Sequence, residues 1–276
     1  MYNKWNDVKG KIDSQSPLIH CITSPIAIND CANAVLALGA KPIMAEHPLE
    51  VENITLMSKS LAVSLANITD ARAESIMISG KAACKAGIPS VIDLVGVTCS
   101  KMREDLAKKY ITQCRPAVIK GNVSEIKAVC GMGFDASSGI DVSDKDKVDS
   151  ANPKSIEEMS YIVKNYAAAN GCVVMASGET DIISDGKEVY HISNGSSRMA
   201  DVTGTGCMLN CITAVFMSVT DALTACVLAA AVLGISGELA DDSRGFGTYH
   251  IGLIDSLSLM DSEKFSQMAK IKKYNK

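Results

Sequence analysis

Short apolar segments alternate with longer amphipathic segments over the first two thirds of the chain. Short runs of apolar and β-branched residues are typical of buried strands, and longer stretches with apolar residues three or four apart are typical of helices. The pattern predicts strands at 17–23, 42–45, 61–66, 90–94, 117–120 and 173–176, and helices at 26–38, 70–86, 100–110, 123–130 and 155–169. This alternation favours an α/β fold with a mostly parallel central sheet flanked by helices.

The last third of the chain has a different pattern. Asp185-Gly186 separates apolar runs at 182–183 and 189–192, which predicts a hairpin that adds antiparallel strands to the sheet. From Thr205 onward the pattern is almost entirely helical. The apolar run 222–235 is shorter than the ~18 to 20 residues that span a bilayer, so we expect a buried helix and no membrane partner.

Two polar stretches interrupt the alternation. Residues 134–153 contain several aspartates without the order of an EF-hand, so a mobile loop is favoured over a calcium site. The lysine-rich stretch 270–276 is expected to be a solvated tail. Because neither an internal repeat nor a linker stands out, we expect a single domain over residues 1–276.

Composition and charge narrow the function classes. The 276 residues are 47% apolar but only 4% aromatic, and the net charge of −4 argues against a protein that binds nucleic acid through its phosphate backbone. Ten cysteines are scattered without a C-x-x-C pair, which makes a zinc or disulfide scaffold improbable. Free thiols and an N-terminus without an apolar signal segment predict a cytoplasmic protein.

The segment 201–209, DVTGTGCML, is the strongest candidate for a chemical site. Gly204 and Gly206 allow a tight turn around Thr205, and the unpaired amides at the start of the following helix would face an anion such as a phosphoryl group. The positive potential of a helix start lowers the pKa of a thiol, so we expect Cys207 to have thiolate character and to act as a base or a nucleophile.

Polar residues also end several predicted strands, where ligands of parallel α/β sheets gather. Asp93 and Glu125 are candidates for holding hydrated Mg²⁺, and Lys120 for neutralising phosphate charge. An alternative with equal weight is that Glu125 only favours the start of its own helix and Asp93 caps the next element. Cys211, four residues after Cys207, is expected to pack as a small hydrophobe.

Six segments together resemble one known family: PLIHCIT (17–23), INDCANA (28–34), LGAKPIM (38–44), GNVSEI (121–126), SGETD (177–181) and VTGTGCML (202–209). The chain resembles the hydroxyethylthiazole kinase family of the ribokinase-like superfamily over most of its length. The resemblance implies ATP-dependent phosphorylation of the alcohol of 4-methyl-5-(2-hydroxyethyl)thiazole in thiamine biosynthesis or salvage. It also implies a homotrimer with active sites at the subunit boundaries.

The resemblance further implies roles for individual residues. It places the thiazole near Met44, Ser24 and Gly204, and the ATP phosphates along the turn that ends at Cys207. The remaining roles that it implies are Lys120, Ser177, Thr205 and Gly206 for the nucleotide, Asp93 and Glu125 for Mg²⁺, and Cys207 for catalysis. Most ribokinase relatives carry a catalytic aspartate at the position of Cys207.

Three departures from the family pattern bear on activity and specificity. Ser24 stands where the family usually has Asn, and Lys120 stands where Arg is usual, which keeps the charge but gives up bidentate phosphate bonding. The segment 93–100 lacks a proline and a glycine. Three alternatives therefore stay open: a kinase for another small heterocyclic or sugar alcohol, a non-catalytic thiazole or nucleotide sensor, and an acyl-transfer enzyme with a cysteine nucleophile.

Overall fold

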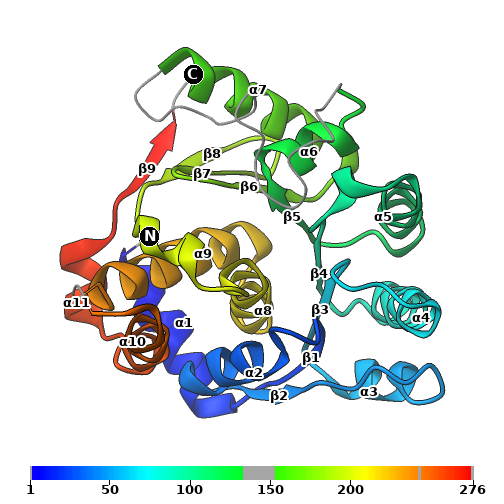
Figure 1. Cartoon of the computed structure of the whole chain (residues 1–276), viewed down its shortest axis with the longest axis horizontal. Helices are drawn as coiled ribbons and strands as arrows, with labels where there is room; N and C mark the ends of the chain where they lie inside the picture. Colours follow the sequence, from blue (N-terminus) through cyan, green and yellow to red (C-terminus); the bar gives the residue numbers. More distant parts are fainter. Residues whose placement is uncertain (1, 133–152, 242–243, 275–276) are drawn as a thin grey trace.

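The computed structural model describes residues 2–132, 153–241 and 244–274 of the chain. The loop predicted at 134–153 lies, except for its last residue, outside the described residues. The predicted α/β fold is confirmed, because one sheet runs through the molecule with helices on both faces (Figure 1).

The sheet contains nine strands within the described ranges, in the order β2-β1-β3-β4-β5-β6-β7-β8-β9. Strands β2 to β6 run parallel to one another in this order, and β7, β8 and β9 each pair antiparallel to the preceding neighbour. The strands are β1 Leu18–Ile22, β2 Lys41–Ile43, β3 Ser60–Ser64, β4 Ser90–Asp93, β5 Val118–Asn122, β6 Val173–Ser177, β7 Asp181–Ser184, β8 Val189–Ile192 and β9 Ile271–Tyr274. The hairpin predicted at Asp185-Gly186 is confirmed as the β7–β8 connection.

Helices bury both faces of the sheet in two separate apolar cores. One core is formed with α1 Tyr2–Gln15, α2 Ile28–Ala37, α8 Thr205–Met217, α9 Ala222–Leu239, α10 Phe246–Ser258 and α11 Ser262–Met268. The other is formed with α3 Val51–Met57, α4 Asp70–Ala86, α5 Lys101–Cys114, α6 Val123–Val129 and α7 Pro153–Asn170. Two short 3₁₀ helices, η1 Val97–Cys99 and η3 Ser197–Asp201, lie in connections.

The solvated tail predicted at 270–276 is wrong for its described part, which forms β9. Ile271 and Tyr274 are partly buried, and the Tyr274 ring lies 5.0 Å from the ring of His191 on β8. Lys273 forms an ion pair with Glu188. The two ends of β9 pack on opposite faces of the sheet, Ile271 against one core and Tyr274 against the other, while Lys272 and Lys273 between them reach solvent.

Helix α9 is longer than the apolar run that predicted it. Over Ala222–Leu239 its 18 residues are long and apolar enough, by length and composition, to cross a membrane, and 78% of that window is buried inside the fold. Its buried residues belong to the core shared with α8 and α10. This burial fits the expected core helix, although the length argument from the sequence was wrong.

Candidate active site

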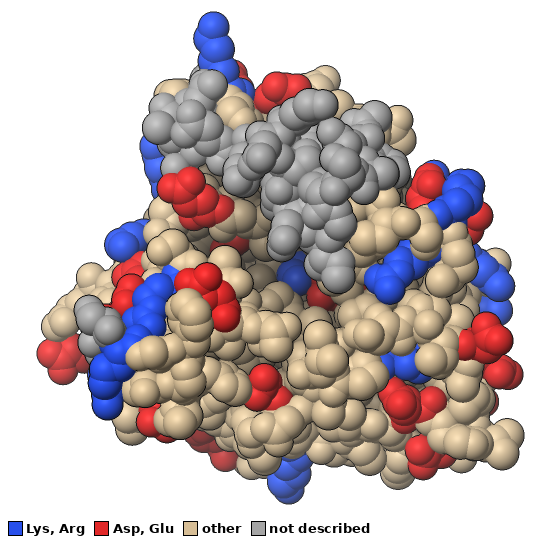
Figure 2. Space-filling view, viewed as in Figure 1, with Lys and Arg blue, Asp and Glu red and all other residues tan. Residues whose placement is uncertain are grey.

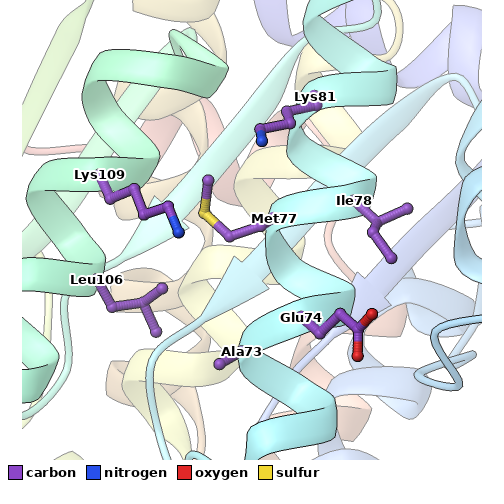
Figure 3. Close-up of a pocket in the computed structure, with 7 residues that line it drawn as sticks. All are labelled: Ala73, Glu74, Met77, Ile78, Lys81, Leu106 and Lys109. Carbon is purple, nitrogen blue, oxygen red and sulfur yellow. The ribbon is translucent and has the colours of Figure 1, made fainter.

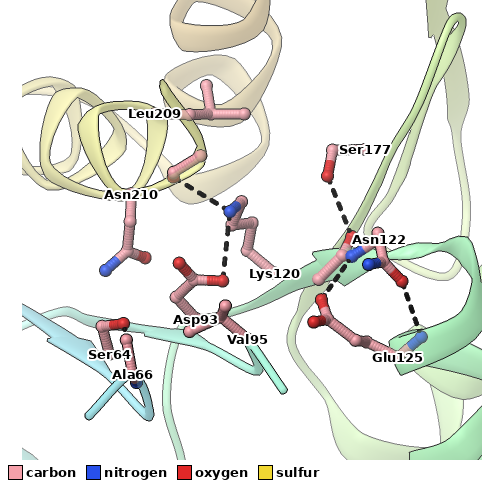
Figure 4. Close-up of polar contacts among 12 residues, drawn as sticks. Ser64, Ala66, Asp93, Val95, Lys120, Asn122, Glu125, Ser177, Leu209 and Asn210 are labelled. Atoms are coloured by element: carbon pink, nitrogen blue, oxygen red, sulfur yellow. Dashed lines mark hydrogen bonds and ion pairs between the residues drawn. The ribbon is translucent and has the colours of Figure 1, made fainter. Parts of the chain in front are cut away.

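The carboxyl ends of β4 and β5 bring two opposite charges together. Asp93 and Lys120 are register partners on these neighbouring strands, and Lys120 Nζ lies 3.1 Å from Asp93 Oδ1. Both side chains are almost completely buried, with 5% and 2% exposed for Lys120 and Asp93. Lys120 Nζ also donates to the carbonyl of Gly206, 2.9 Å away in the first turn of α8 (Figure 4). A buried ammonium thus links the sheet edge to the glycine turn.

The charges of this cluster shift each other's protonation. Burial is the largest single influence on the pKa of Lys120 and lowers it, but the negative charges of Asp93, Cys207 and Glu125 together with the hydrogen bond to Asp93 outweigh burial, so the pKa is raised. Burial raises the pKa of Asp93, and the Lys120 ammonium and a backbone hydrogen bond from Val95 oppose that rise. Lys120 therefore holds a positive charge at the point where the sequence places phosphates.

Glu125 is buried at the start of α6 and accepts two backbone hydrogen bonds. Its Oε1 accepts from Gly96 N at 2.8 Å and its Oε2 from Asn122 N at 2.7 Å, while Asn122 Oδ1 accepts from Glu125 N at 2.9 Å. This capping box shows that Glu125 stabilises the start of its own helix, whether or not it also takes part in binding Mg²⁺. Burial, together with the charge of Asp93, raises the pKa of Glu125 to about 7.

The raised pKa of Glu125 predicts a pH-dependent stability. A carboxyl whose pKa is about 7 when folded and 4.5 when unfolded binds its proton more tightly in the native state, so the free energy of unfolding falls as pH rises from 4.5 to 7. The decline due to this group is expected to reach about 3 kcal/mol. Urea unfolding at pH 5 and pH 8 measures it, and Glu125→Gln should flatten the pH dependence. Asp181, whose pKa burial also raises to about 7, is the second contributor, and Asp181→Asn isolates it.

The glycine turn has the geometry of an anion-binding helix start. Gly204 precedes α8 with φ of 90°, and no side chain in the described part of the chain caps the first turn of this helix. The Thr205 hydroxyl donates to the carbonyl of Met199 at 3.2 Å and so turns away from the helix start. The first amides of α8 are thus left to a ligand or to water.

Cys207 is buried in this first turn, but its thiol is not activated. Burial raises the pKa of Cys207 to about 12, and the charge of Asp93 adds to the rise, while Lys120 and a hydrogen bond from the Thr23 hydroxyl oppose it. The expectation of thiolate character was therefore wrong, because burial outweighs the potential of the helix start. Cys211 is fully buried in the apolar core, in line with its expected packing role.

The predicted substrate residues lie at the ends of β1 and β2. Ser24 is buried just after β1 and donates to Asn67 Oδ1 at 2.7 Å. Met44 follows β2 directly and is partly buried against the core. Ser177, at the end of β6, donates to the carbonyl of Gly121 at 3.2 Å (Figure 4). The structure thus places the predicted site residues at the carboxyl ends of the parallel strands, in the first turn of α6 or at the start of α8.

Two further observations concern metal binding and cavities. Within the described residues there is no group of three or more His, Cys, Asp or Glu side chains that could hold a metal by themselves. A cavity of about 410 Å³ between α4 and α5 is lined by Ala73, Glu74, Met77, Ile78, Lys81, Leu106 and Lys109 (Figure 3). None of the predicted site residues lines this cavity. Figure 2 instead shows a hollow near the centre of the face seen in Figure 1, with basic and acidic atoms at its floor.

Sequence reasoning missed Arg72 and Asn67, which contact the residues at the end of β1. Arg72 lies on a helix predicted at 70–86, where an isolated charge is normally solvated. Asn67 has φ of 49° in the β3–α4 connection. No spacing or motif in the sequence distinguishes these two residues from surface residues.

Residues 10–263 match the model of the hydroxyethylthiazole kinase family. The chain belongs to this family. "Hydroxyethylthiazole kinase 2" from Clostridium botulinum is 48% identical over 267 residues, which cover 97% of this chain and 99% of that protein. "Hydroxyethylthiazole kinase 1" from Methanosphaera stadtmanae is 38% identical, over 94% of this chain and 93% of that protein.

Two solved structures have a similar fold. A hydroxyethylthiazole kinase protein from Pyrococcus horikoshii OT3 superposes with a TM-score of 0.86 at 27% identity, covering 98% of each chain. Pyridoxal kinase from Staphylococcus aureus, in complex with AMP-PCP and pyridoxal, has a TM-score of 0.59 at 13% identity, covering 80% of this chain and 87% of that chain. The second likeness concerns the fold alone, and it agrees with the ribokinase-like architecture of this hydroxyethylthiazole kinase family member.

Proposed function

We propose that this chain transfers the γ-phosphoryl group of ATP to the alcohol of 4-methyl-5-(2-hydroxyethyl)thiazole, in thiamine biosynthesis or salvage. The observation that carries the proposal is the buried Lys120–Asp93 pair bonded to the glycine turn of α8, in a chain of the hydroxyethylthiazole kinase family. A fixed cation beside a row of helix-start amides suits a phosphoryl group in transfer.

In this proposal the protein acts mainly by positioning and charge neutralisation. The amides from Thr205 to Cys207 receive the oxygens of the transferring phosphoryl group, and Lys120 adds positive charge beneath them. Ser24 and Met44 hold the alcohol near the turn, with Gly204 leaving room for it. Ser177 and Gly206 lie on the nucleotide side.

Cys207 has a limited role in this proposal. Because its pKa is raised to about 12, the group is a thiol at neutral pH and does not serve as a standing base. It contacts the attacking hydroxyl and relays its proton: the sulfur accepts the hydroxyl proton while the S–H proton passes to an oxygen of the transferring phosphoryl group. The same raised pKa disfavours the alternative of a cysteine nucleophile for acyl transfer, since the thiolate is the reactive form.

Mg²⁺ would be held by Asp93 and Glu125 together with phosphate oxygens and water. Carboxylate oxygens are the donors that Mg²⁺ prefers, and one or two of them suffice when a nucleotide supplies the remaining ligands. The carboxylates of Asp93 and Glu125 are close enough for the charge of Asp93 to raise the pKa of Glu125, a coupling that a divalent cation would relieve. Mg²⁺ bound there would supply further charge neutralisation for the phosphates.

We further propose a single cytoplasmic kinase domain that assembles as a homotrimer. Large apolar side chains are exposed on α10 and just before α2, namely Phe246 (56% exposed), Ile251 (63%) and Ile26 (66%). Exposed apolar residues of this size are common at subunit contacts. Light scattering coupled to gel filtration gives the mass of the assembly directly.

The test of the proposed activity is ADP release from Mg-ATP with the thiazole alcohol supplied or omitted. We expect ADP release that depends on the alcohol, and a lower turnover in Cys207→Ser. Full activity of Cys207→Ser would remove this thiol from the mechanism. ADP release only with a different heterocyclic or sugar alcohol would favour the alternative of a kinase for that alcohol. Ser24 gives a specific reason for this alternative, because it replaces the Asn that the family usually has next to the substrate and its hydroxyl is bonded to Asn67.

A further inference from the structure

Arg72 is a buried cation on the acceptor side of the proposed site. It lies in the first turn of α4, after the Thr69 cap, and only 3% of its surface is exposed. Its Nη2 donates to the carbonyl of Thr23, and its Nη1 lies 3.5 Å from Glu46 Oε2. One guanidinium therefore joins the end of β1 to the segment that follows β2.

The two segments that Arg72 joins are the two that carry the proposed contacts to the alcohol. Thr23 precedes Ser24, and the Thr23 hydroxyl lies 3.6 Å from the sulfur of Cys31 on α2. Glu46 lies two residues after Met44. The relative positions of Ser24 and Met44 thus depend on the contacts of Arg72 with Thr23 and Glu46.

Other side chains hydrogen-bond the main chain of the segment after β2 and fix its position. His20 Nε2 lies 2.9 Å from the carbonyl of Ala45, and the Ser75 hydroxyl donates to the carbonyl of Glu46 at 2.7 Å. Burial lowers the pKa of His20, and its Nδ1 lies 2.9 Å from the Thr55 hydroxyl. The main chain of this segment is anchored by these bonds, whereas the Glu46 carboxylate is held by Arg72.

Arg72 is not fully satisfied by these contacts. Its Nε and Nη1 are buried without a hydrogen-bond partner among the described residues, since the contact of Nη1 with Glu46 is long. The N–H groups of a buried arginine that serves only stability normally all have hydrogen-bond acceptors, because an unpaired buried donor is destabilising. A cation tolerated in this state beside a reaction site points to a role in the site.

On the basis of the proposed function, we infer that Arg72 is a positioning residue that sets the spacing between the Ser24 and Met44 walls of the alcohol pocket and thereby determines specificity for the alcohol. The side chain acts through Thr23 and Glu46 and does not contact the nucleotide. Loss of this link should weaken binding of the alcohol while leaving binding of ATP unchanged.

The experiment measures KM for the thiazole alcohol, KM for ATP and kcat in Arg72→Lys and Glu46→Gln. In Arg72→Lys the lysine keeps the charge but cannot reach both Thr23 and Glu46. Glu46→Gln removes only the charge of a half-exposed carboxylate, so this second variant preserves the core even if Arg72→Lys lowers stability. We expect KM for the alcohol to rise about 10-fold to 100-fold in Arg72→Lys, with KM for ATP within about 2-fold. Arg115→Lys, exposed at the end of α5, is the matched control and should leave all three values unchanged.

Three outcomes separate this inference from the proposed function. If the unmodified enzyme shows no ADP release that depends on the thiazole alcohol, the proposed function fails first. If it turns over the alcohol and both variants keep its KM, or if KM for ATP rises in parallel, Arg72 has only a structural role and the inference is overturned. Non-additive effects in the Arg72→Lys/Glu46→Gln double variant would support it, because the two side chains would then act as one unit.

Discussion

Replacing Lys120 with Met is expected to lower kcat/KM by about 10²-fold to 10³-fold, the loss typical of removing one preorganised charge that stabilises a transition state. Met has a similar volume but no charge, so the Asp93 carboxylate would be left buried without its partner. Removing one member of a buried ion pair costs about 3–5 kcal/mol of stability. Steady-state kinetics with ATP and the thiazole alcohol, together with urea unfolding, measure the two losses separately.

A second substitution separates catalysis from stability. In Asp93→Asn/Lys120→Met the pair is neutral, so we expect much of the lost stability to return while the activity stays low. Lys120→Arg keeps the positive charge at the sheet edge and should retain activity within about 10-fold of the unmodified enzyme. Full activity in Lys120→Met would contradict the placement of phosphate charge next to this side chain.

The sheet was largely predictable because its period and its turn signals are local. The strands ending at Asp93 and near Lys120 are short apolar runs whose side chains are all or nearly all buried, and the Asp185-Gly186 turn is a strong hairpin signal. Residues at the ends of parallel strands share one edge, so the grouping of Asp93 and Lys120 followed from topology alone. Their direct ion pair did not, because strand order cannot be read from spacing.

Burial decided the features that could not be predicted. A glycine turn before Cys207 correctly indicates a helix start, but whether its thiol is activated depends on how deeply it lies and on the charge of Asp93 beside it. The sequence predicts Arg72 to be a solvated residue on an amphipathic helix, but tertiary packing buries it. The terminal strand β9 exists because β8 offers an edge and His191 a ring to pack on, both of which are distant in the sequence.

Gly204→Ala is expected to lower kcat/KM by about 10²-fold through displacement of the anion-binding amides. The residue has φ of 90°, which strains any side chain, and an added Cβ would lie 2.9 Å from the Cβ of Ala27. Because Ala27 is buried at the start of α2, the turn must move rather than its neighbour. A shift of the turn moves the amides of Thr205 to Cys207 away from the phosphoryl oxygens, so kcat should fall more than KM for the alcohol rises.

Gly87→Ala is the matched control for this substitution. Gly87 ends α4 with φ of 69°, so alanine there meets the same kind of backbone strain, but nothing lies within 4 Å of the added Cβ. Both variants should therefore lose about 1–2 kcal/mol of stability from strain, whereas only Gly204→Ala should lose activity. Equal kinetics for the two variants would mean that the turn before α8 tolerates displacement, which a set of amides preorganised around a transferring phosphoryl group would not.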